Sequence, residues 1–319
     1  MAEDATKEGL PRSLASSFMD PFVPVGGGES LSCNIEDYPS GIVLPIDKPY
    51  RWTSADVIRK VKFSAIRHFH KKNLKVGHAG TLDPLATGVL LVCIGNATKL
   101  AQSFQDHDKE YLAGIMFGAT TPSYDREKDI DRRFPYEHIT KDAVAEVLPL
   151  FLGAQEQIAP LFSAKSVDGV RAYEMARSMY KRAARTSHAF FSSEAMSADF
   201  DAAALSVLHT AKITIHSLSL ESFSPDGPDT GPLPGHSLSD DLVSAASSRI
   251  NVIDTSLLGL PVATVRIACS KGTYIRAFAR DLGEALSSGA FLDSLCRTRT
   301  GDFSVEKALS LDEALSLFD

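Results

Sequence analysis

One short run of residues limits the possible folds of this chain more than any other feature of its sequence. Residues 77–91 contain a single carboxylate, Asp83, and a single histidine, His78, among small, apolar and hydroxyl residues. Pro84 directly follows the Asp and disfavours a helical backbone at Asp83. Residues 89–94 are apolar enough to form a buried strand or helix. We therefore expect a loop that carries one charged group and is anchored on the core.

An isolated Asp-Pro pair is most often a surface turn, but here the whole run has a known counterpart. It resembles the catalytic motif G-H-x-G-x-L-D-P-x-A-T-G of the TruB family of tRNA pseudouridine synthases, in which the Asp is the nucleophile. Other blocks that resemble the family occur in the expected order along the chain: residues 41–49 and 52–54, 108–111, 118–125, 160–164, 173–177, 269–276, 281–283 and 295–299.

This resemblance implies the fold and the activity. The expected fold is α+β, a pseudouridine synthase fold with a central mixed or antiparallel sheet flanked by helices and loops. The expected reaction converts the T-loop uridine at position 55 of tRNA to pseudouridine. Many family members continue into a small RNA-binding domain after the equivalent of Phe303. Only sixteen residues follow here, so we expect a short form without that domain.

The resemblance also assigns roles to individual residues. Asp83 is the expected nucleophile, and Arg276 is its expected cationic partner. Tyr111 matches the residue that stacks on the target base, and His78 matches the histidine that fills the gap left in the T-loop.

Other matched positions have less defined roles. Asp125, Tyr274 and Leu295 match positions that shape the nucleotide pocket. Lys271 and Lys48 either contact phosphate or hold local structure, and the sequence leaves both open. Two departures from the family pattern are a lysine shifted by one place to Lys165 and a changed loop before Asp125.

The chemistry needs few components. Uridine and pseudouridine have the same composition, so we expect no cofactor, nucleotide or metal. A carboxylate suits the role of transient covalent nucleophile. Attack at C1′ of the ribose and attack at C6 of the base both remain open. The target base must first be extruded from the folded RNA loop.

Charge distribution bears on RNA binding. The chain has a net charge of -7, but residues 51–75 contain eight Lys or Arg residues and one acid, a local charge of +7. A second basic cluster lies at residues 171–185. Each stretch could be a solvated helix face, but both flank recognised motifs. We therefore expect them to contact RNA, because polyanion binding requires local basic surface. The partner that the resemblance implies is tRNA, through its T-arm and T-loop.

Composition excludes several other classes of protein. No segment is apolar enough to span a membrane, and the N-terminus lacks the pattern of a signal peptide. The four cysteines are scattered without metal-ligand spacing. We expect a monomeric protein of the cytoplasm with reduced thiols and no membrane partner.

Periodicity predicts the main elements. Helices are expected at residues 54–70 (capped by Ser54), 140–151, 173–182 and 273–286, with one closing helix within 304–319. Strands are expected at 41–45, 111–117, 211–220 and 262–269. Residues 1–38 are expected to form a loose arm and 39–319 the catalytic domain, with insertions at 183–209 and 222–250.

Two rival functions follow from the same residues. The scaffold could belong to a non-catalytic RNA-binding or tRNA-folding protein, but such a protein would not need Asp83, Tyr111 and Arg276 together. Residues 77–81 could form a phosphate loop, but the lysine of the motif G-x-x-x-x-G-K-[ST] is absent.

Overall fold

A nine-stranded mixed sheet forms the centre of the protein. The computed structural model describes residues 21–24, 30–160, 166–167, 170–171, 210–227 and 250–319. Every strand pairing in the sheet is antiparallel except that between β3 and β12. The main strand order is β1 (Ile42–Lys48), β3 (Ala86–Ile94), β12 (Ala290–Thr300), β4 (Lys109–Phe117), β11 (Val262–Cys269), β10 (Thr210–Ser224) and β7 (Gly153–Ile158), while β2 (Val76–Ala79) pairs with β3 and β13 (Phe303–Ser304) with β12.

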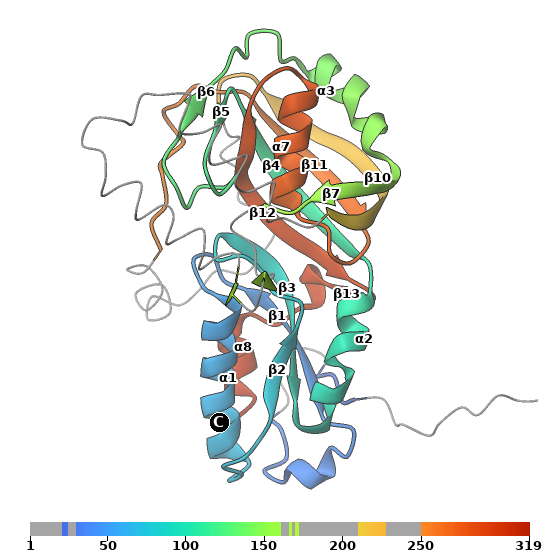
Figure 1. Ribbon diagram of the computed structural model, residues 1–319. Coiled ribbons are helices and arrows are strands. Elements are labelled where there is room, and N and C mark those ends of the chain that lie inside the picture. Colours follow the sequence, from blue (N-terminus) through green and yellow to red (C-terminus); the bar gives the residue numbers. More distant parts are fainter. Residues whose placement is uncertain (1–20, 25–29, 161–165, 168–169, 172–209, 228–249) are drawn as a thin grey trace, which may run out of the picture.

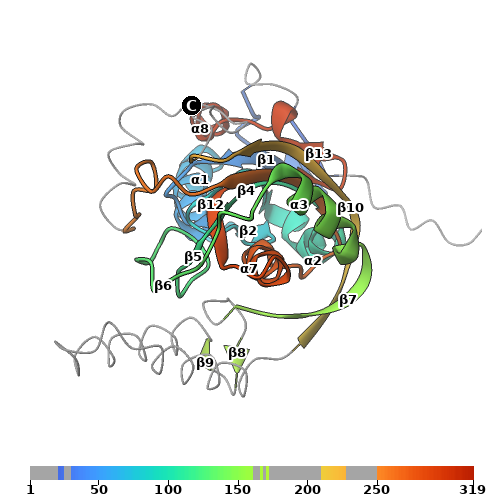
Figure 2. The same cartoon turned by 90° about the horizontal axis from the view of Figure 1, so that it is seen from above.

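The helices cover this sheet at two levels (Figure 1). In the view of Figure 1, α7 (Ile275–Ala285) and α3 (Lys141–Val147) lie in the upper half. The lower half contains α1 (Ser54–His68), α8 (Leu311–Ser316) and α2 (Ala101–Asp106). Seen from above, the upper part of the sheet curves around α7 (Figure 2). The remaining short elements are η1 (Ile35–Asp37), η2 (Gly95–Leu100), η3 (Leu148–Phe151), η4 (Val305–Lys307), β5 (Ala119–Thr120), β6 (Arg132–Arg133), β8 (Ser166–Val167) and β9 (Val170–Arg171).

Strand β12 was not predicted, yet it joins the two levels. It lies between β3 and β4 in the sheet and pairs Leu295 with Ala86 in the parallel ladder to β3. Gly88 on β3 has φ +97°, and a Cβ there would lie 2.2 Å from the backbone oxygen of Arg297. Glycine therefore permits the close approach of these two strands beside the Asp83 motif.

Most of the predicted elements within the described residues are present. The strand predicted at 262–269 coincides with β11, those at 111–117 and 211–220 lie within β4 and β10, and that at 41–45 overlaps β1, which begins one residue later. The 140–151 prediction corresponds to α3 followed by η3, with Thr140 as the N-cap. The cap of α1 is Thr53 rather than Ser54, because Thr53 and Asp56 form a reciprocal capping box. The predicted helix at 173–182 lies outside the described residues.

The ends of the chain show further differences from the expected pattern. The closing segment 304–319 forms η4 and the short α8 instead of one helix. Within the segment expected as a loose arm, Leu31 and Ile35 are buried in the main core, and Phe22 bridges Ile42 of β1. These described parts of the arm therefore pack on the domain. The insertion predicted at 183–209 lies outside the described residues.

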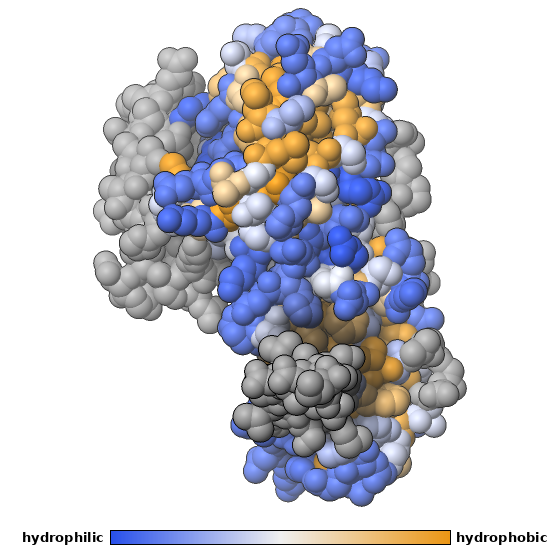
Figure 3. Space-filling model, turned by 90° about the vertical axis from the view of Figure 1, so that its right-hand side faces the viewer, coloured by the Kyte–Doolittle hydropathy of each residue, from blue (hydrophilic) through white to orange (hydrophobic). Residues whose placement is uncertain are grey.

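The surface is mixed in character. The right-hand side of the molecule has an apolar area in its upper part and polar residues around it (Figure 3). In the segment between α3 and β7, the large apolar side chains of Leu150 and Leu152 are exposed. None of the described helices combines the length and apolar composition needed to cross a lipid bilayer.

Candidate active site

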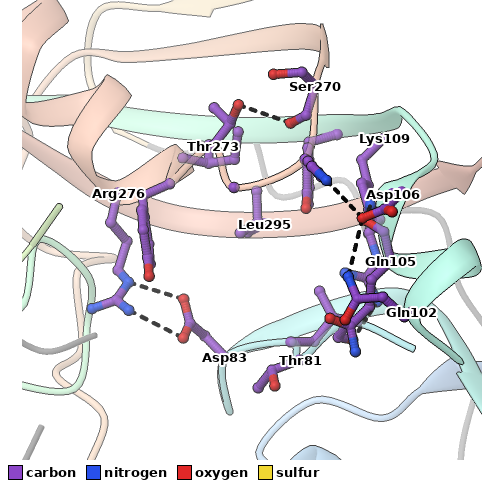
Figure 4. A pocket seen from close by; sticks show the side chains of 18 residues that line it. Thr81, Asp83, Gln102, Gln105, Asp106, Lys109, Ser270, Thr273, Arg276 and Leu295 are labelled. Carbon is purple, nitrogen blue, oxygen red and sulfur yellow. Dashed lines mark hydrogen bonds and ion pairs between the residues drawn. The ribbon is translucent and has the colours of Figure 1, made fainter. Parts of the chain in front are cut away.

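A pocket of about 520 Å³ lies where the Asp83 loop (residues 80–85) meets the upper half of the sheet. Its wall also includes the end of α2, the start of β4, part of β12, and the turn that leads into α7 (Figure 4). The volume is in the usual range for small-ligand sites. Six of the eight residues expected from the sequence line it: Asp83, Tyr111, Lys271, Tyr274, Arg276 and Leu295.

Asp83 and Arg276 face each other across one side of this pocket (Figure 4). Arg276 Nε donates to Asp83 Oδ2 at 2.9 Å, and Nη2 donates to Oδ1 at 3.1 Å. The Arg276 side chain is only 6% exposed, whereas Asp83 is 39% exposed. This two-point contact orients the carboxylate while leaving it accessible from the pocket.

Arg276 is held from behind by the loop after β5. Its Nη1 donates to the backbone oxygen of Ser123 at 3.1 Å, and Asp125 Oδ2 lies 3.8 Å from its Nε. Burial alone would lower the pKa of Arg276, but the negative charges of Asp83, Asp125 and Glu127 outweigh it and raise that pKa. The guanidinium therefore stays charged.

Asp125 supports Arg276 and does not line the pocket. Its carboxylate accepts hydrogen bonds from the Ser123 hydroxyl at 2.6 Å and from the backbone N–H of Glu127 at 2.9 Å. Burial raises the pKa of Asp125, although the charge of Arg276 lowers it. Burial and the charge of Asp125 raise the pKa of Glu127 to about 7.

The Asp83 loop is attached to the start of α1 by buried polar contacts. The Ser54 hydroxyl donates to the backbone oxygen of Leu82 at 3.1 Å and accepts from the backbone N–H of Leu82 at 3.0 Å. Lys48 lies beneath the loop and is fully buried. Its Nζ donates to the backbone oxygens of Pro49, Trp52 and Pro84 at 2.8, 2.6 and 3.2 Å.

These contacts decide between the two roles that the sequence left open for Lys48. A fully buried ammonium that donates to three backbone oxygens holds local structure and cannot contact a phosphate in solvent. Burial lowers the pKa of Lys48 to about 7, although the nearby charge of Asp83 raises it. The loop therefore lies on a cation whose charge changes near neutral pH.

Arg297 attaches the other side of the same loop. It is 2% exposed, and it donates from Nε to the backbone oxygen of Val89 at 2.8 Å and from Nη2 to that of Gly80 at 3.1 Å. The backbone N–H of Gly88 donates to the buried Asp47 at 2.8 Å. Neighbouring strands thus hold both ends of the loop in place.

A glutamine on β7 holds the start of α7. Gln157, 3% exposed, donates to the backbone oxygen of Tyr274 at 3.1 Å and accepts from the backbone N–H of Tyr274 at 2.8 Å. Tyr274 is the N-cap residue of α7, so this pair of contacts sets the position from which Arg276 reaches Asp83.

Tyr111 and Leu295 form the apolar floor of the pocket. Both are at least nine-tenths buried and come from neighbouring strands, β4 and β12. Burial raises the pKa of the Tyr111 phenol. The ring and the aliphatic side chain therefore provide an uncharged surface beside the Asp83–Arg276 pair.

The other end of the pocket is polar (Figure 4). Lys271 Nζ lies 2.8 Å from Asp106 Oδ1, and the Gln102 amide donates to the same oxygen at 3.1 Å. Lys271 and Asp106 have 60% and 44% exposed side chains. An exposed pair of this kind contributes little to stability, so Lys271 can exchange partners at low cost.

His78 does not line the pocket. It lies on β2, paired in register with Val92 of β3, and its ring is partly buried. Its Nδ1 is buried without a hydrogen-bond partner among the described residues. Burial lowers the pKa of His78, and the charge of Arg297 lowers it further. The structure therefore brings together seven of the eight expected residues, counting Asp125 behind Arg276.

Several residues that build the site were missed or left without a role. Arg297 lies within a block already matched to the family, and this match could have marked it as a residue of the site. Ser54 was assigned to a helix cap. Gln157 is the last of three consecutive polar residues in β7, and no local pattern distinguishes it from its neighbours. No group of three or more His, Cys, Asp or Glu side chains within the described ranges could hold a metal ion.

The family comparison agrees with this geometry. Residues 67–224 match the family model described as "TruB family pseudouridylate synthase (N terminal domain)". The "tRNA pseudouridine synthase B" of Phocaeicola vulgatus is 41% identical over 276 residues, which cover 86% of this chain and 92% of that protein. The chain belongs to the TruB family.

One further relative agrees with this membership, and one solved structure shares the fold. The Thermus thermophilus "tRNA pseudouridine synthase B" is 37% identical over 268 residues, covering 84% of this TruB chain and 75% of that protein. The structure titled "Crystal Structure of a Cbf5-Nop10-Gar1 Complex" is similar with a TM-score of 0.51 and 20% identity, covering 89% of this chain and 61% of that one. This structural similarity supports the pseudouridine synthase fold.

Proposed function

We propose that this TruB protein is a tRNA pseudouridine synthase that isomerises the T-loop uridine at position 55, with Asp83 as the nucleophile. The observation that carries the proposal is the two-point contact between Asp83 and Arg276 at the wall of the pocket. It supplies an ionised, oriented and accessible carboxylate beside an apolar floor. Family membership, with relatives named tRNA pseudouridine synthase B, supports the substrate class.

The reaction needs no change of composition. The bond between C1′ and N1 of uridine breaks, and a bond between C1′ and C5 forms. The hydrogen at C5 is lost and N1 gains one. Attack of Asp83 at C1′ and attack at C6 both begin with the same ionised carboxylate, and Arg276 keeps it in position for either.

The other pocket residues have roles that fit an extruded nucleotide. In this proposal the Tyr111 ring stacks on the uracil, and Leu295 contacts it from the neighbouring strand. Lys271 contacts a phosphate after leaving Asp106. Asp125 and Tyr274 position Arg276 and the start of α7, and His78 fills the gap left in the T-loop.

In this proposal the enzyme acts as a monomer in the cytoplasm. One chain supplies both the carboxylate and its guanidinium partner, which supports a monomer acting on the T-arm. The proposed location is the cytoplasm, with the pool of tRNA to be modified.

Mapping of pseudouridine in unmodified tRNA transcripts tests this function. Purified protein should convert the uridine at position 55 and should do so equally well with EDTA present. A transcript with cytidine at that position is the matched control and should stay unmodified. Pseudouridine that appears only at other positions, or an activity lost with EDTA and restored by zinc, would contradict the proposal.

A further inference from the structure

Helix α1 has two faces of opposite character. Its buried face packs on the core through a stripe at helical spacing, and its first turn holds the Asp83 loop through Ser54. Its outer surface is basic, with Lys60, Lys62 and Arg67 exposed. The helix runs from the Asp83 loop down the lower half of the molecule (Figure 1). It therefore connects the catalytic pocket to a distant basic surface.

The distant part of this surface is hollowed. A second pocket of about 500 Å³ lies between α1 and the segment that leads into β2. Its wall includes the three lysines Lys62, Lys72 and Lys75, together with Thr98 and the backbone around Gly77. All three lysines are exposed, so their ammonium groups can reach a ligand in the hollow without a change of fold.

These lysines have no acidic partner within the described part of the chain. The nearby acids Asp56 and Glu36 are already paired with Arg59 at 2.7 Å and Lys71 at 2.8 Å. No ion pair joins Lys62, Lys72 or Lys75 to a described residue. Three unneutralised cations around one hollow, in a protein of net charge -7, favour an anionic ligand.

The hollow is too far from Asp83 to serve the nucleotide in the pocket. Lys62 is eight residues after Ser54, which corresponds to about 12 Å along a helix that rises 1.5 Å per residue. At roughly 3 Å per base pair, this is about four steps of a stacked strand. A phosphate in the hollow therefore belongs to nucleotides away from the extruded base.

We propose that the hollow between Lys62, Lys72 and Lys75 binds a backbone phosphate of the paired RNA stem that adjoins the modified loop. This inference rests on the proposed function and extends it to the substrate outside the catalytic pocket. Lysines bind phosphates as point charges and release counterions on contact, so this site contributes affinity and salt dependence without reading sequence. It positions the stem, while the pocket selects the base.

A charge-neutral triple variant tests the site. Lys62→Gln, Lys72→Gln and Lys75→Gln together should weaken binding of a T-arm hairpin about tenfold at low salt. The slope of log affinity against log salt should become shallower by about 1, as expected for one lost phosphate contact. The rate at saturating RNA should stay within about twofold of wild type, because no catalytic group is changed.

Two controls separate this site from a general charge effect. A variant with Lys141→Gln, Lys212→Gln and Lys307→Gln removes the same charge from exposed positions that line neither hollow, and it should bind as wild type does. A hairpin whose stem is shortened to its loop-proximal pairs should bind both triple variants and wild type alike. Affinity is measured by fluorescence anisotropy, and turnover by pseudouridine formation.

The possible results are distinguishable. An unchanged affinity and salt slope in the hollow variant would overturn the phosphate site, and so would an equal loss in both triple variants. Lysine-dependent retention on anionic vesicles with unchanged RNA binding would assign the surface to a membrane instead. A wild type that binds the hairpin through these lysines but forms no pseudouridine would refute the proposed function alone.

Discussion

The Asp83 loop and the basic hollow at the other end of α1 use charge in opposite ways. At the loop, Lys48, Arg276 and Arg297 are at least nine-tenths buried, and each donates to specific oxygen atoms. At the hollow, Lys62, Lys72 and Lys75 are exposed to solvent. Buried charges fix geometry, because each needs an acceptor. Exposed charges act through their number and are screened by salt. Changes at the loop should therefore alter rate, and changes at the hollow should alter affinity.

The largest expected effect separates rate from affinity completely. Asp83→Asn keeps the size of the side chain and removes the proposed nucleophile, so turnover should fall at least about 10³-fold. RNA affinity should stay within about twofold, because most contacts go to phosphates and loop shape. Pseudouridine mapping and anisotropy measure the two quantities. The exposed Asp302→Asn is the matched control. Turnover near wild type in Asp83→Asn would show that Asp83 is only a turn residue.

The second test concerns the planar partner of that carboxylate. Arg276→Lys keeps the charge but cannot reproduce two parallel hydrogen bonds and the bond to Ser123. We expect kcat to fall about 10²-fold with KM nearly unchanged. Arg266→Lys, on a partly exposed network with Glu110 and Glu221 away from the pocket, should change neither value. A large rise in KM with normal kcat would mean that Arg276 binds RNA and does not orient Asp83.

A smaller effect should follow from loosening the loop where it meets α1. Ser54→Ala leaves the buried backbone groups of Leu82 without their partner. We expect a loss of about 1–2 kcal/mol in the free energy of unfolding and a several-fold lower kcat. Denaturant unfolding and initial rates measure these quantities. The control is Ser64→Ala on the same helix, whose hydroxyl makes no hydrogen bond to a described residue. Equal losses in both variants would indicate a helix effect unrelated to the loop.

The smallest expected effect is a pH dependence of stability caused by Lys48. The unfolded chain keeps this lysine protonated up to a pKa near 10.5, whereas the folded protein releases the proton near pH 7. Unfolding then takes up a proton at Lys48, so the contribution of Lys48 to stability rises with pH, whereas that of Glu127, whose pKa is raised to about 7, falls with pH. Between about pH 7 and pH 8, Lys48 should raise the free energy of unfolding by about 1 kcal/mol. Lys109, whose pKa burial lowers to about 8, begins to act in the same direction at the upper end of this range.

The measurement compares unfolding free energies at those two pH values. Lys48→Met should flatten the rise, whatever its effect on absolute stability. The exposed Lys60→Met should leave the rise unchanged. If both variants kept the wild-type slope, the buried cation under the loop would not be titrating in this range.

Much of this site could be predicted because its residues lie within local motifs. Asp83, Tyr111, Arg276 and Leu295 occur in four separate blocks of sequence, and the fold brings all four into one pocket. Gln157 and Ser54 could not be assigned in this way. Their contacts are to backbone atoms of residues distant in sequence, and backbone atoms leave no signature in residue type.

The two lysines left open by the sequence show the same limit. Lys48 and Lys271 both lie in recognised motifs, yet one is fully buried and the other has a 60% exposed side chain. Burial depends on what packs around a residue. Strand β12 was missed for a related reason, since its partners β3 and β4 are far away in the chain and its own sequence mixes polar and apolar residues.

The sequence by itself determined the residue types that the chemistry requires, their order, and the strong local elements such as β11 and α1. Those features follow from local backbone preferences and from side-chain chemistry, which every residue carries with it. Only the tertiary structure decided that Arg276 reaches Asp83 at two points and that three lysines surround one hollow. Such juxtapositions arise from sheet pairing and core packing, which depend on contacts between residues distant in sequence.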